Sequence, residues 1–335
     1  MKERLEYLDA IKGLAIFLMV MGHAIAWNYA DPTLCIFDFT QPTNIKAGGS
    51  IYQLIYSFHM PLFFIVSGYL TYKAYLFKDF INFAKKKVIR LLLPWACTMW
   101  LVYLVRGAIG YWFLLCLFEL SIIGFILICI MQIINKRNYF IIDLIILAIT
   151  YLLLRYLHIQ DLSYGELQLG KFMGSLLPFF TGVFLKKYNT LFSICVKQTW
   201  FFTLNFIFFA LLFGSRYLQN YNIILKYMYE YSNIILSISG SLLAFHILYK
   251  RTFQKLRPIL AYIGKKTLPI YILHIIFVIQ IPRIGECLLT QNPVTIITLQ
   301  ILYSTIISII AILLSLFVYR IIITSTLLKH LFFGE

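Results

Sequence analysis

The chain has 335 residues, of which 61% are hydrophobic and 13% are charged, and its mean hydropathy is +0.85. Soluble domains are about 45–50% apolar and about 25% charged, so this composition excludes a soluble protein and predicts an integral membrane protein. The formal net charge of +16 does not predict a nucleic-acid partner, because the lysines and arginines lie in short stretches between apolar runs, as in the loops of membrane proteins.

The apolar runs predict an all-α, polytopic protein with about ten transmembrane helices, each close to the ~20 residues that a bilayer core requires. In chain order we expect them at residues 11–30, 52–72, 91–105, 111–134, 139–157, 170–185, 199–214, 229–249, 260–281 and 294–319. The stretch 250–266 is expected to be a basic cytoplasmic loop with room for a short interfacial helix. No internal repeat or linker is visible, so residues 1–335 are predicted to form a single transmembrane domain.

The distribution of Lys and Arg predicts the orientation of the chain. The loops on one side of the ten helices hold most of these residues, including the run at 85–87, whereas the opposite loops hold few and also contain acidic residues. The Lys- and Arg-rich side is expected to face the cytoplasm, and an even number of spans places both termini there. We therefore expect a multi-pass protein of the plasma (inner, cytoplasmic) membrane, with membrane lipid as a partner.

The six cysteines do not predict a metal site. They occur at positions 35, 97, 116, 129, 195 and 287, without CxxC or Cys/His spacing. Four of them lie in apolar runs, where a free thiol behaves as a small hydrophobic group. No metal cofactor is expected.

Lys12 and His23 are the most informative polar residues, because both lie in the first apolar segment, LDAIKGLAIFLMVMGHA. Ionisable side chains are costly inside a bilayer and commonly mark functional sites. A helix turns by about 100° and rises by about 1.5 Å per residue, so eleven steps place these side chains on nearly the same face, roughly 16 Å apart. This separation is too long for contact and suits two ends of one pathway.

His59, in FHMPLFFIVSG, is expected at a depth similar to that of His23, on the second helix. An imidazole has an unperturbed pKa near 6.5 and can act as a general base near neutral pH. The alternative for both residues is a core histidine whose ring nitrogen is satisfied by a neighbouring carbonyl. Pro61 is expected to free a backbone carbonyl and to kink the helix close to His59.

Three basic residues are expected near the cytoplasmic edge of the membrane. Lys12 follows Asp9 by one turn, so it is either a snorkelling lysine paired with that carboxylate or an anion clamp at the mouth of a cavity. Lys87 belongs to a basic run of the kind that sets topology. Arg90 lies against the apolar run LLLPWA, where it requires a partner or a phosphate.

Other polar residues lie within predicted helices, namely Glu119, Arg155, His246 and His274. Glu119 is expected to pair with a histidine or with Arg155, because an unpaired charge at that depth is costly. His274, in LPIYILH, is expected at mid-membrane in the ninth helix. The outer end of the fourth helix presents Tyr111 and Trp112, which could face a sugar.

The stretch RLEYLDAIKGLAIFLMVMGH at 4–23 resembles the opening of the membrane-bound acyltransferase family 3. The segment YSFHMPLFFIVSGYL at 56–70 resembles the second helix of that family, particularly in its fucose 4-O-acetylase-like branch. Later stretches resemble further landmarks of the family in the same order: FAKKKVIRLLLPW, WFLLCLF, LLPFFTGVFLKK and LPIYILH. In this family a basic residue and a histidine, separated by ten residues, mark the active centre. Lys12 and His23 occupy these positions, with lysine where arginine is usual.

The resemblance implies an enzyme that transfers an acetyl, or another short acyl group, from acyl-CoA to a hydroxyl of a cell-surface or secreted glycan. Acetyl-CoA is then the acyl donor, with its phosphates near Lys12, Lys87 and Arg90. His23 is expected to act as general base, and His59 or a nearby donor to stabilise the oxyanion. A covalent acyl-histidine relay is the alternative to direct transfer.

Two other functions fit the sequence. The first is a glycan or lipid-linked sugar exporter without acyl transfer, in which the histidines line a translocation path. The second is acylation of a small metabolite or amino acid on the cytoplasmic side.

Overall fold

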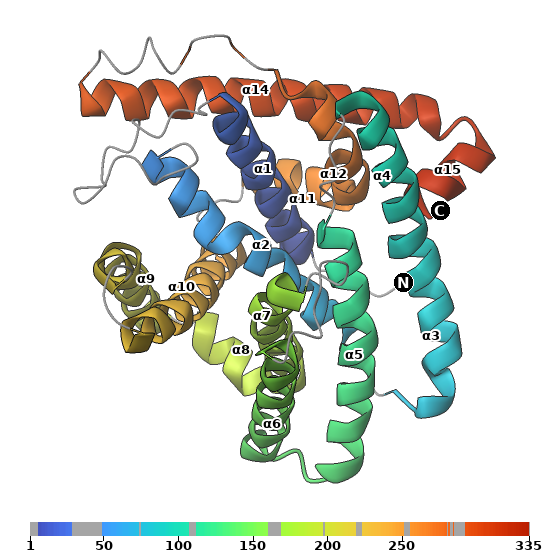
Figure 1. Cartoon of the computed structure of the whole chain (residues 1–335), viewed down its shortest axis with the longest axis vertical. Helices are drawn as coiled ribbons and strands as arrows, with labels where there is room; N and C mark the ends of the chain where they lie inside the picture. Colours follow the sequence, from blue (N-terminus) through green and yellow to red (C-terminus); the bar gives the residue numbers. More distant parts are fainter. Residues whose placement is uncertain are drawn as a thin grey trace. The chain divides into compact units, whose positions relative to one another are not determined.

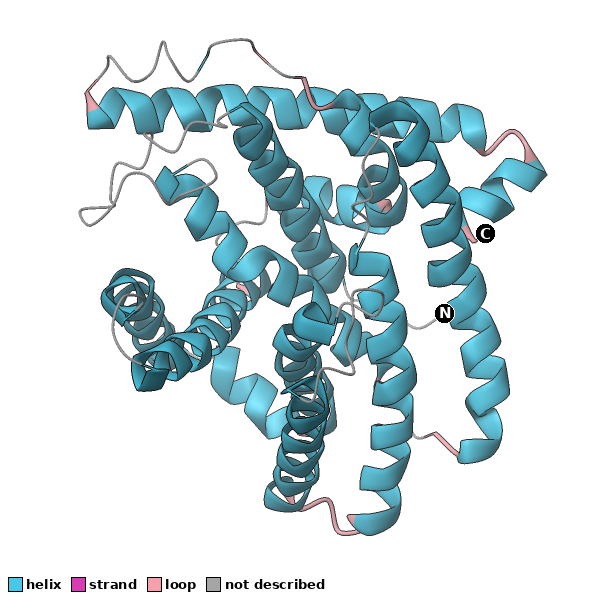
Figure 2. Ribbon diagram, in the orientation of Figure 1, coloured by secondary structure: helices cyan, strands magenta, loops and turns pink. Residues whose placement is uncertain are grey.

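The computed structural model describes residues 6–28, 49–73, 75–106, 112–159, 169–196, 198–218, 223–250, 255–279, 281, 284 and 292–334. Within these ranges the chain forms helices and no β-strand (Figures 1 and 2), which confirms the predicted all-α class. The chain divides into two compact units, unit 1 with Met1–Leu62 and Thr203–Ser325, and unit 2 with Phe63–Phe202 and Thr326–Glu335. The single domain over residues 1–335 stays a prediction.

Unit 1 is built around α1. Its elements are α1 (Glu6–Asn28), the first part of α2 (Gly49–Thr71), most of α9 (Gln198–Leu218), α10 (Ile223–Tyr249), α11 (Arg257–Lys265), α12 (Thr267–Phe277) and α14 (Pro293–Ile322). Helix α1 contacts α10, α11, α12 and α14. A helix that is apolar on every side is suited to such a central position.

The crossing of α1 and α11 depends on two glycines. A Cβ added at Gly13 of α1 would lie 1.9 Å from the carbonyl oxygen of Leu260, and one at Gly264 of α11 would lie 1.7 Å from that of Asp9. The two backbones therefore touch, as small residues allow between membrane helices. This close crossing fixes the segment of α1 that contains Asp9 and Lys12.

Unit 2 contains the remaining helices. They are the second part of α2, η3 (Phe77–Asp79), α3 (Phe80–Lys87), η4 (Val88–Leu92), α4 (Leu93–Arg106), α5 (Trp112–Ile134), α6 (Phe140–Ile159), α7 (Leu169–Lys187), α8 (Asn189–Val196) and α15 (Thr326–Phe333). Helix α7 contacts α5, α6 and α8, and α15 contacts α4.

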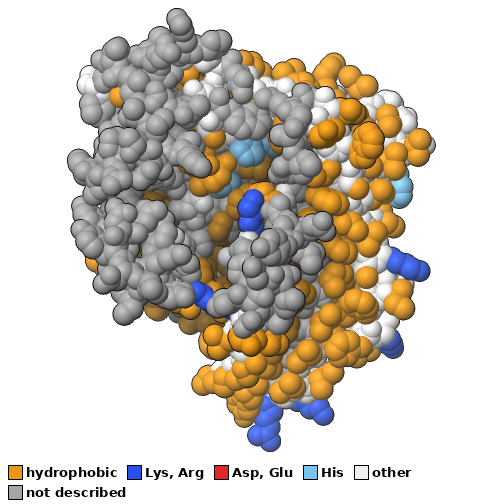
Figure 3. Space-filling model, viewed as in Figure 1, with side chains coloured by type: hydrophobic (Ala, Val, Ile, Leu, Met, Phe, Trp, Pro, Cys, Tyr) orange, Lys and Arg blue, Asp and Glu red, His pale blue; other side chains and the backbone are white. Residues whose placement is uncertain are grey.

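Five described helices, α1, α2, α5, α10 and α14, are long and apolar enough to cross a membrane. Two bent pairs of shorter helices, α8 with α9 and α11 with α12, raise this number to seven if each pair is one span. Hydrophobic side chains cover most of the described surface in Figure 3, as contact with lipid requires. The ten spans and the cytoplasmic position of both termini stay predictions.

The expected continuous helix over 260–281 is wrong. The chain bends by 86° between α11 and α12, at Lys266, whose backbone leaves the helical region with φ −118° and ψ 27°. Pro269 explains the break, because proline has no N–H to donate and its ring clashes with the carbonyl four residues earlier in a continuous helix. A short helix does form within the stretch 250–266, since α11 begins at Arg257.

The basic run at 85–87, expected in a loop, is helical instead. It ends α3, and the chain continues through the π-helical turn η4 into α4. The amide of Leu93 bonds to the carbonyl of Val88 across this turn. Pro94 explains the irregularity, because it cannot donate to the carbonyl of Arg90 one turn before it. Arg90 therefore lies in a π-turn, a feature often found at functional sites.

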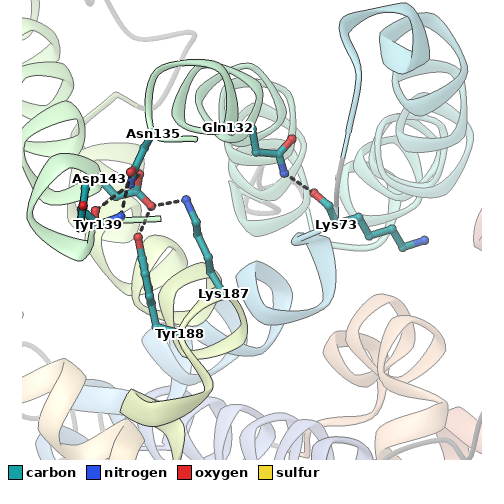
Figure 4. A network of polar contacts seen from close by, with 7 residues as sticks. All are labelled: Lys73, Gln132, Asn135, Tyr139, Asp143, Lys187 and Tyr188. Carbon is teal, nitrogen blue, oxygen red and sulfur yellow. Dashed lines mark hydrogen bonds and ion pairs between the residues drawn. The ribbon is translucent and has the colours of Figure 1, made fainter. Parts of the chain in front are cut away.

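A buried ionic network ties three helices of unit 2 together (Figure 4). The carboxylate of Asp143, on α6, is fully buried and accepts hydrogen bonds from Asn135 Nδ2 at 2.8 Å, Lys187 Nζ at 2.6 Å and the Tyr188 hydroxyl at 2.8 Å. Burial and the hydrogen bond to Asp143 raise the pKa of Tyr188, which therefore stays a donor. These three hydrogen bonds compensate the buried charge of Asp143, as a buried carboxylate requires. Figure 4 also shows a separate hydrogen bond, from Gln132 to the main-chain carbonyl of Lys73 at 2.8 Å.

Some sequence predictions lie outside the described residues. They are Tyr111, Cys35 and Cys287. The other four cysteines are free thiols, and two of them, Cys116 and Cys129, are buried, as expected of small hydrophobic groups.

Candidate functional site

The central feature of unit 1 is a direct contact between two histidines. His23 lies near the end of α1 and His274 near the end of α12. Nδ1 of His23 is 2.8 Å from Nε2 of His274, and the two ring planes are inclined by only 12°. His274 is fully buried, whereas His23 keeps partial exposure. The pair joins positions 251 residues apart in the chain.

The backbone of α12 orients the ring of His274. Its Nδ1 is 2.7 Å from the carbonyl oxygen of Tyr271 and 3.0 Å from that of Ile270. Carbonyl oxygens only accept hydrogen bonds, so Nδ1 of His274 must carry the proton and donate it. This local bond is available because the two carbonyls belong to the preceding turn of the same helix.

Asn28 ties together the chain segments that follow the two histidines. Its Nδ2 donates to the carbonyl of Ala24 at 2.7 Å, one turn back on α1, and to that of Ile279 at 3.0 Å, just beyond α12. Its Oδ1 accepts a hydrogen bond from the amide of Ile281. The amide of Asn28 therefore holds the end of α1 against the end of α12. Sequence reasoning missed this residue, since an asparagine at a helix end has many ordinary roles.

His59 is a buried histidine on α2 with only 1% of its surface exposed. Its Nδ1 is 2.8 Å from the carbonyl oxygen of Ile55, so Nδ1 is the protonated nitrogen. The ring of Tyr56 packs edge-on at 4.7 Å, and His59 lies within electrostatic range of His23. The carbonyl bond is the one expected of a core histidine, and it leaves the lone pair on Nε2.

Lys12 forms the ion pair that its spacing predicts. Its Nζ is 2.7 Å from Oδ1 of Asp9, and the carboxylate is almost fully buried while the lysine is partly exposed. An ammonium group has three donors, so pairing with Asp9 is compatible with a second contact to an anion. The predicted pairing of Lys12 with Asp9 is confirmed, whereas the snorkelling of Lys12 and its role as an anion clamp stay predictions.

Lys87 and Arg90 form a separate basic patch in unit 2. Lys87 Nζ lies 5.3 Å from the centre of the Phe83 ring. Burial of the amine, with a contribution from the charge of Arg90, lowers the pKa of Lys87 to about 8. Arg90 is exposed in the π-turn, and Gly334, with φ +60°, lies directly against the backbone of this turn.

Oε1 of Glu119 is buried and has no hydrogen-bond partner among the described residues. The expected pairing of Glu119 with Arg155 or with a histidine stays a prediction. Trp112, on the same helix, forms a cation–π contact with Lys171, whose Nζ lies 4.6 Å from the centre of the Trp112 ring. Sequence reasoning cannot assign such pairs, because it does not say which helices are neighbours.

The structure thus brings together His23 with His274, and Lys12 with Asp9, in unit 1. The sequence placed His59 at a depth similar to that of His23, and the hydrogen-bonded partner of His23 is His274, which was expected at mid-membrane in the ninth helix. Within the described ranges, no group of three His, Cys, Asp or Glu side chains is placed to hold a metal ion.

The chain is similar to a known protein family and to a known protein. The family model described as "Acyltransferase domain" matches residues 5–320 and so runs through both units. A stretch of 163 residues is 29% identical to the nodulation protein NolL of Mesorhizobium japonicum, covering 43% of this chain and 40% of that protein. No solved structure matches the chain.

Proposed function

This chain belongs to acyltransferase family 3, and we propose that it is a membrane enzyme that transfers an acetyl or other short acyl group from acyl-CoA to a glycan hydroxyl. The single observation that supports the proposal best is the His23–His274 contact at 2.8 Å. It equips one imidazole of α1 with a buried partner, which is the arrangement that general-base catalysis uses.

His23 acts as a general base in the proposed reaction. His23 removes the proton from the acceptor hydroxyl while the hydroxyl oxygen attacks the thioester carbonyl carbon. The tetrahedral intermediate collapses, the carbon–sulfur bond breaks, and the ester bond to the acceptor remains. The thiolate of coenzyme A takes the proton from the imidazolium, which restores neutral His23. A positioned base of this kind contributes about 10²–10⁴-fold to the rate.

His59 is the second histidine that we assign to the site. In its neutral form with Nδ1 bonded to Ile55, the ring offers a lone pair at Nε2 and no N–H there. It would stabilise an oxyanion only after gaining a proton at Nε2. His59 stays a candidate residue of the site, and an oxyanion role for it would require the charged ring.

The basic residues are the proposed determinants of donor binding. Coenzyme A carries phosphates, and ammonium and guanidinium groups form short, charge-assisted hydrogen bonds with phosphate oxygens. Lys12, Lys87 and Arg90 are the candidates that the sequence indicates. Lysine at position 12 presents a point charge where a bidentate arginine is usual in the family, so a weaker and less directional phosphate contact is expected.

The acceptor and the location complete the proposal. The resemblance of residues 56–70 to the fucose 4-O-acetylase-like branch supports a glycan hydroxyl as acceptor. The excess of Lys and Arg in one set of loops supports a plasma-membrane protein with that side in the cytoplasm. The acyl donor then arrives from the cytoplasm, and the acceptor from the outer side.

The experiment is an acyl-transfer assay on the purified protein in lipid nanodiscs. Radiolabelled acetyl-CoA is supplied with and without a panel of oligosaccharides, and both thiol release and label in the sugar are measured. We expect both to rise together when an acceptor is present. Transport of a lipid-linked sugar in proteoliposomes without any thiol release would instead establish an exporter. Label that appears only in a small metabolite would show that the acceptor is a cytoplasmic metabolite and not a glycan.

A further inference from the structure

We propose that His274 is a positioning residue that fixes the tautomer of His23, so that Nε2 of His23 is the nitrogen that accepts the acceptor's proton. This inference rests on the proposed function, because it deepens the role of His23 as base. It is carried by a chain of hydrogen bonds that begins at the backbone of α12 and ends at His23.

His274 is protonated on Nδ1. Its Nδ1 faces two carbonyl oxygens, at 2.7 Å and 3.0 Å. A bare Nδ1 would bring its lone pair against two further acceptors, so the proton is on Nδ1. In the neutral ring, Nε2 then holds the lone pair and can only accept a hydrogen bond.

The proton position on His274 determines which nitrogen of His23 carries its proton. A separation of 2.8 Å between Nδ1 of His23 and Nε2 of His274 is that of a hydrogen bond and requires one proton between the nitrogens. Since Nε2 of His274 accepts, Nδ1 of His23 donates. Neutral His23 has one ring proton, and its lone pair therefore lies on Nε2.

The opposite arrangement needs a charge inside the core. For His23 to hold its proton on Nε2, its Nδ1 would have to accept, and His274 would have to donate from both nitrogens as a cation. His274 is fully buried, and burying an uncompensated charge is costly. The neutral chain of two imidazoles is therefore the stable state.

The same contact also serves the protonated state of His23. When Nε2 takes the acceptor's proton, the imidazolium still donates from Nδ1 to His274, and a charged donor strengthens this hydrogen bond. His274 thus does for His23 what a buried carboxylate does for the histidine of a serine hydrolase, namely set the tautomer and support the cation. It does so without a permanent negative charge, which suits a site inside a membrane.

Two substitutions of similar polarity separate this role from simple packing. The amide oxygen of glutamine reaches about as far from Cα as Nε2 of histidine, so His274→Gln can still accept from Nδ1 of His23. Asparagine reaches only as far as Nδ1, so His274→Asn keeps the bond to the α12 carbonyls and loses the one to His23. We expect His274→Gln to keep acyl transfer within about tenfold of wild type, and His274→Asn to lower kcat on the order of 10²-fold or more with an unchanged KM for acetyl-CoA. His330→Asn, at an exposed histidine of α15, is the matched control.

The tautomer itself is read by nitrogen NMR of ¹⁵N-histidine-labelled protein in lipid bilayers, with the His23 signals assigned through His23→Gln. We expect the proton of His23 on Nδ1 in wild type and redistributed to Nε2 in His274→Asn. A proton on Nε2 in wild type, or equal activity of the Gln and Asn variants, would overturn the proposal. If wild type transfers no acyl group, the proposed function fails, while the NMR measurement still decides the tautomer.

Discussion

Gly22 of α1 lies directly against the ring of Tyr56 of α2. A Cβ at position 22 would stand 2.6 Å from Cε2 of Tyr56, well inside van der Waals contact. The same tyrosine packs against the ring of His59, with centroids 4.7 Å apart. The missing side chain at Gly22, immediately before His23, therefore sets how closely the histidine-bearing turn of α2 approaches α1.

Replacing Gly22 with alanine should lower acyl transfer without unfolding the protein. The added methyl group must displace the tyrosine ring, which moves His59 relative to His23, and a misplaced catalytic group can reduce the rate by about 10²-fold. The measurement is kcat for acetyl transfer, with folding followed by the thermal transition. Gly174→Ala is the matched control, because a Cβ there would meet nothing within 4 Å, and alanine favours a helix by about 1 kcal/mol. Equal loss of activity in both variants would contradict a role for Gly22 in positioning His59 relative to His23.

The sequence predicts those features of the structure that depend on residues close together in the chain. Apolar runs of about 20 residues predict the helices because hydrophobicity is a property of each segment, and the one-turn spacing of Asp9 and Lys12 predicts their ion pair for the same reason. The break at Lys266 had a local signal in Pro269, which the long apolar run at 260–281 outweighed. The His23–His274 contact had none, because it joins residues 251 positions apart and depends on which helices pack together.

Removing the charge of Asp143 should destabilise the protein strongly. Asp143→Asn leaves the ammonium of Lys187, 2.6 Å away and only 3% exposed, buried without its counter-ion. Breaking a buried pair by removing one partner costs about 3–5 kcal/mol. Thermal unfolding in detergent should show the loss, and adding Lys187→Met should recover part of it, because the second change removes the stranded charge. No difference between the single and double variants would contradict a buried ion pair.

Donor binding should weaken above about pH 8. Burial and the charge of Arg90 lower the pKa of Lys87 to about 8, so the amine is cationic below that pH and loses its charge as the pH rises through it. If Lys87 contacts a phosphate, the Kd for coenzyme A should be flat below pH 7.5 or so and increase by roughly fivefold to tenfold toward pH 9, a modest change because the partly exposed amine is screened. Coenzyme A without the acyl group avoids hydrolysis of the thioester, and calorimetry measures the Kd.

The matched variant for this test is Lys87→Arg. Arginine stays charged throughout this range, so its Kd should show no rise toward pH 9. A rise that persists in Lys87→Arg would assign the titration to another group and remove Lys87 from the donor site.

The most direct test of the account is the rate of acetyl transfer by His23→Ala and His23→Gln beside wild type, measured as sugar-dependent thiol release from acetyl-CoA in nanodiscs. A general base at this position predicts a fall in kcat of about 10²–10⁴-fold for both variants, with the thermal transition and the Kd for coenzyme A unchanged. Wild-type rates in either variant would contradict the assignment of His23 as the base.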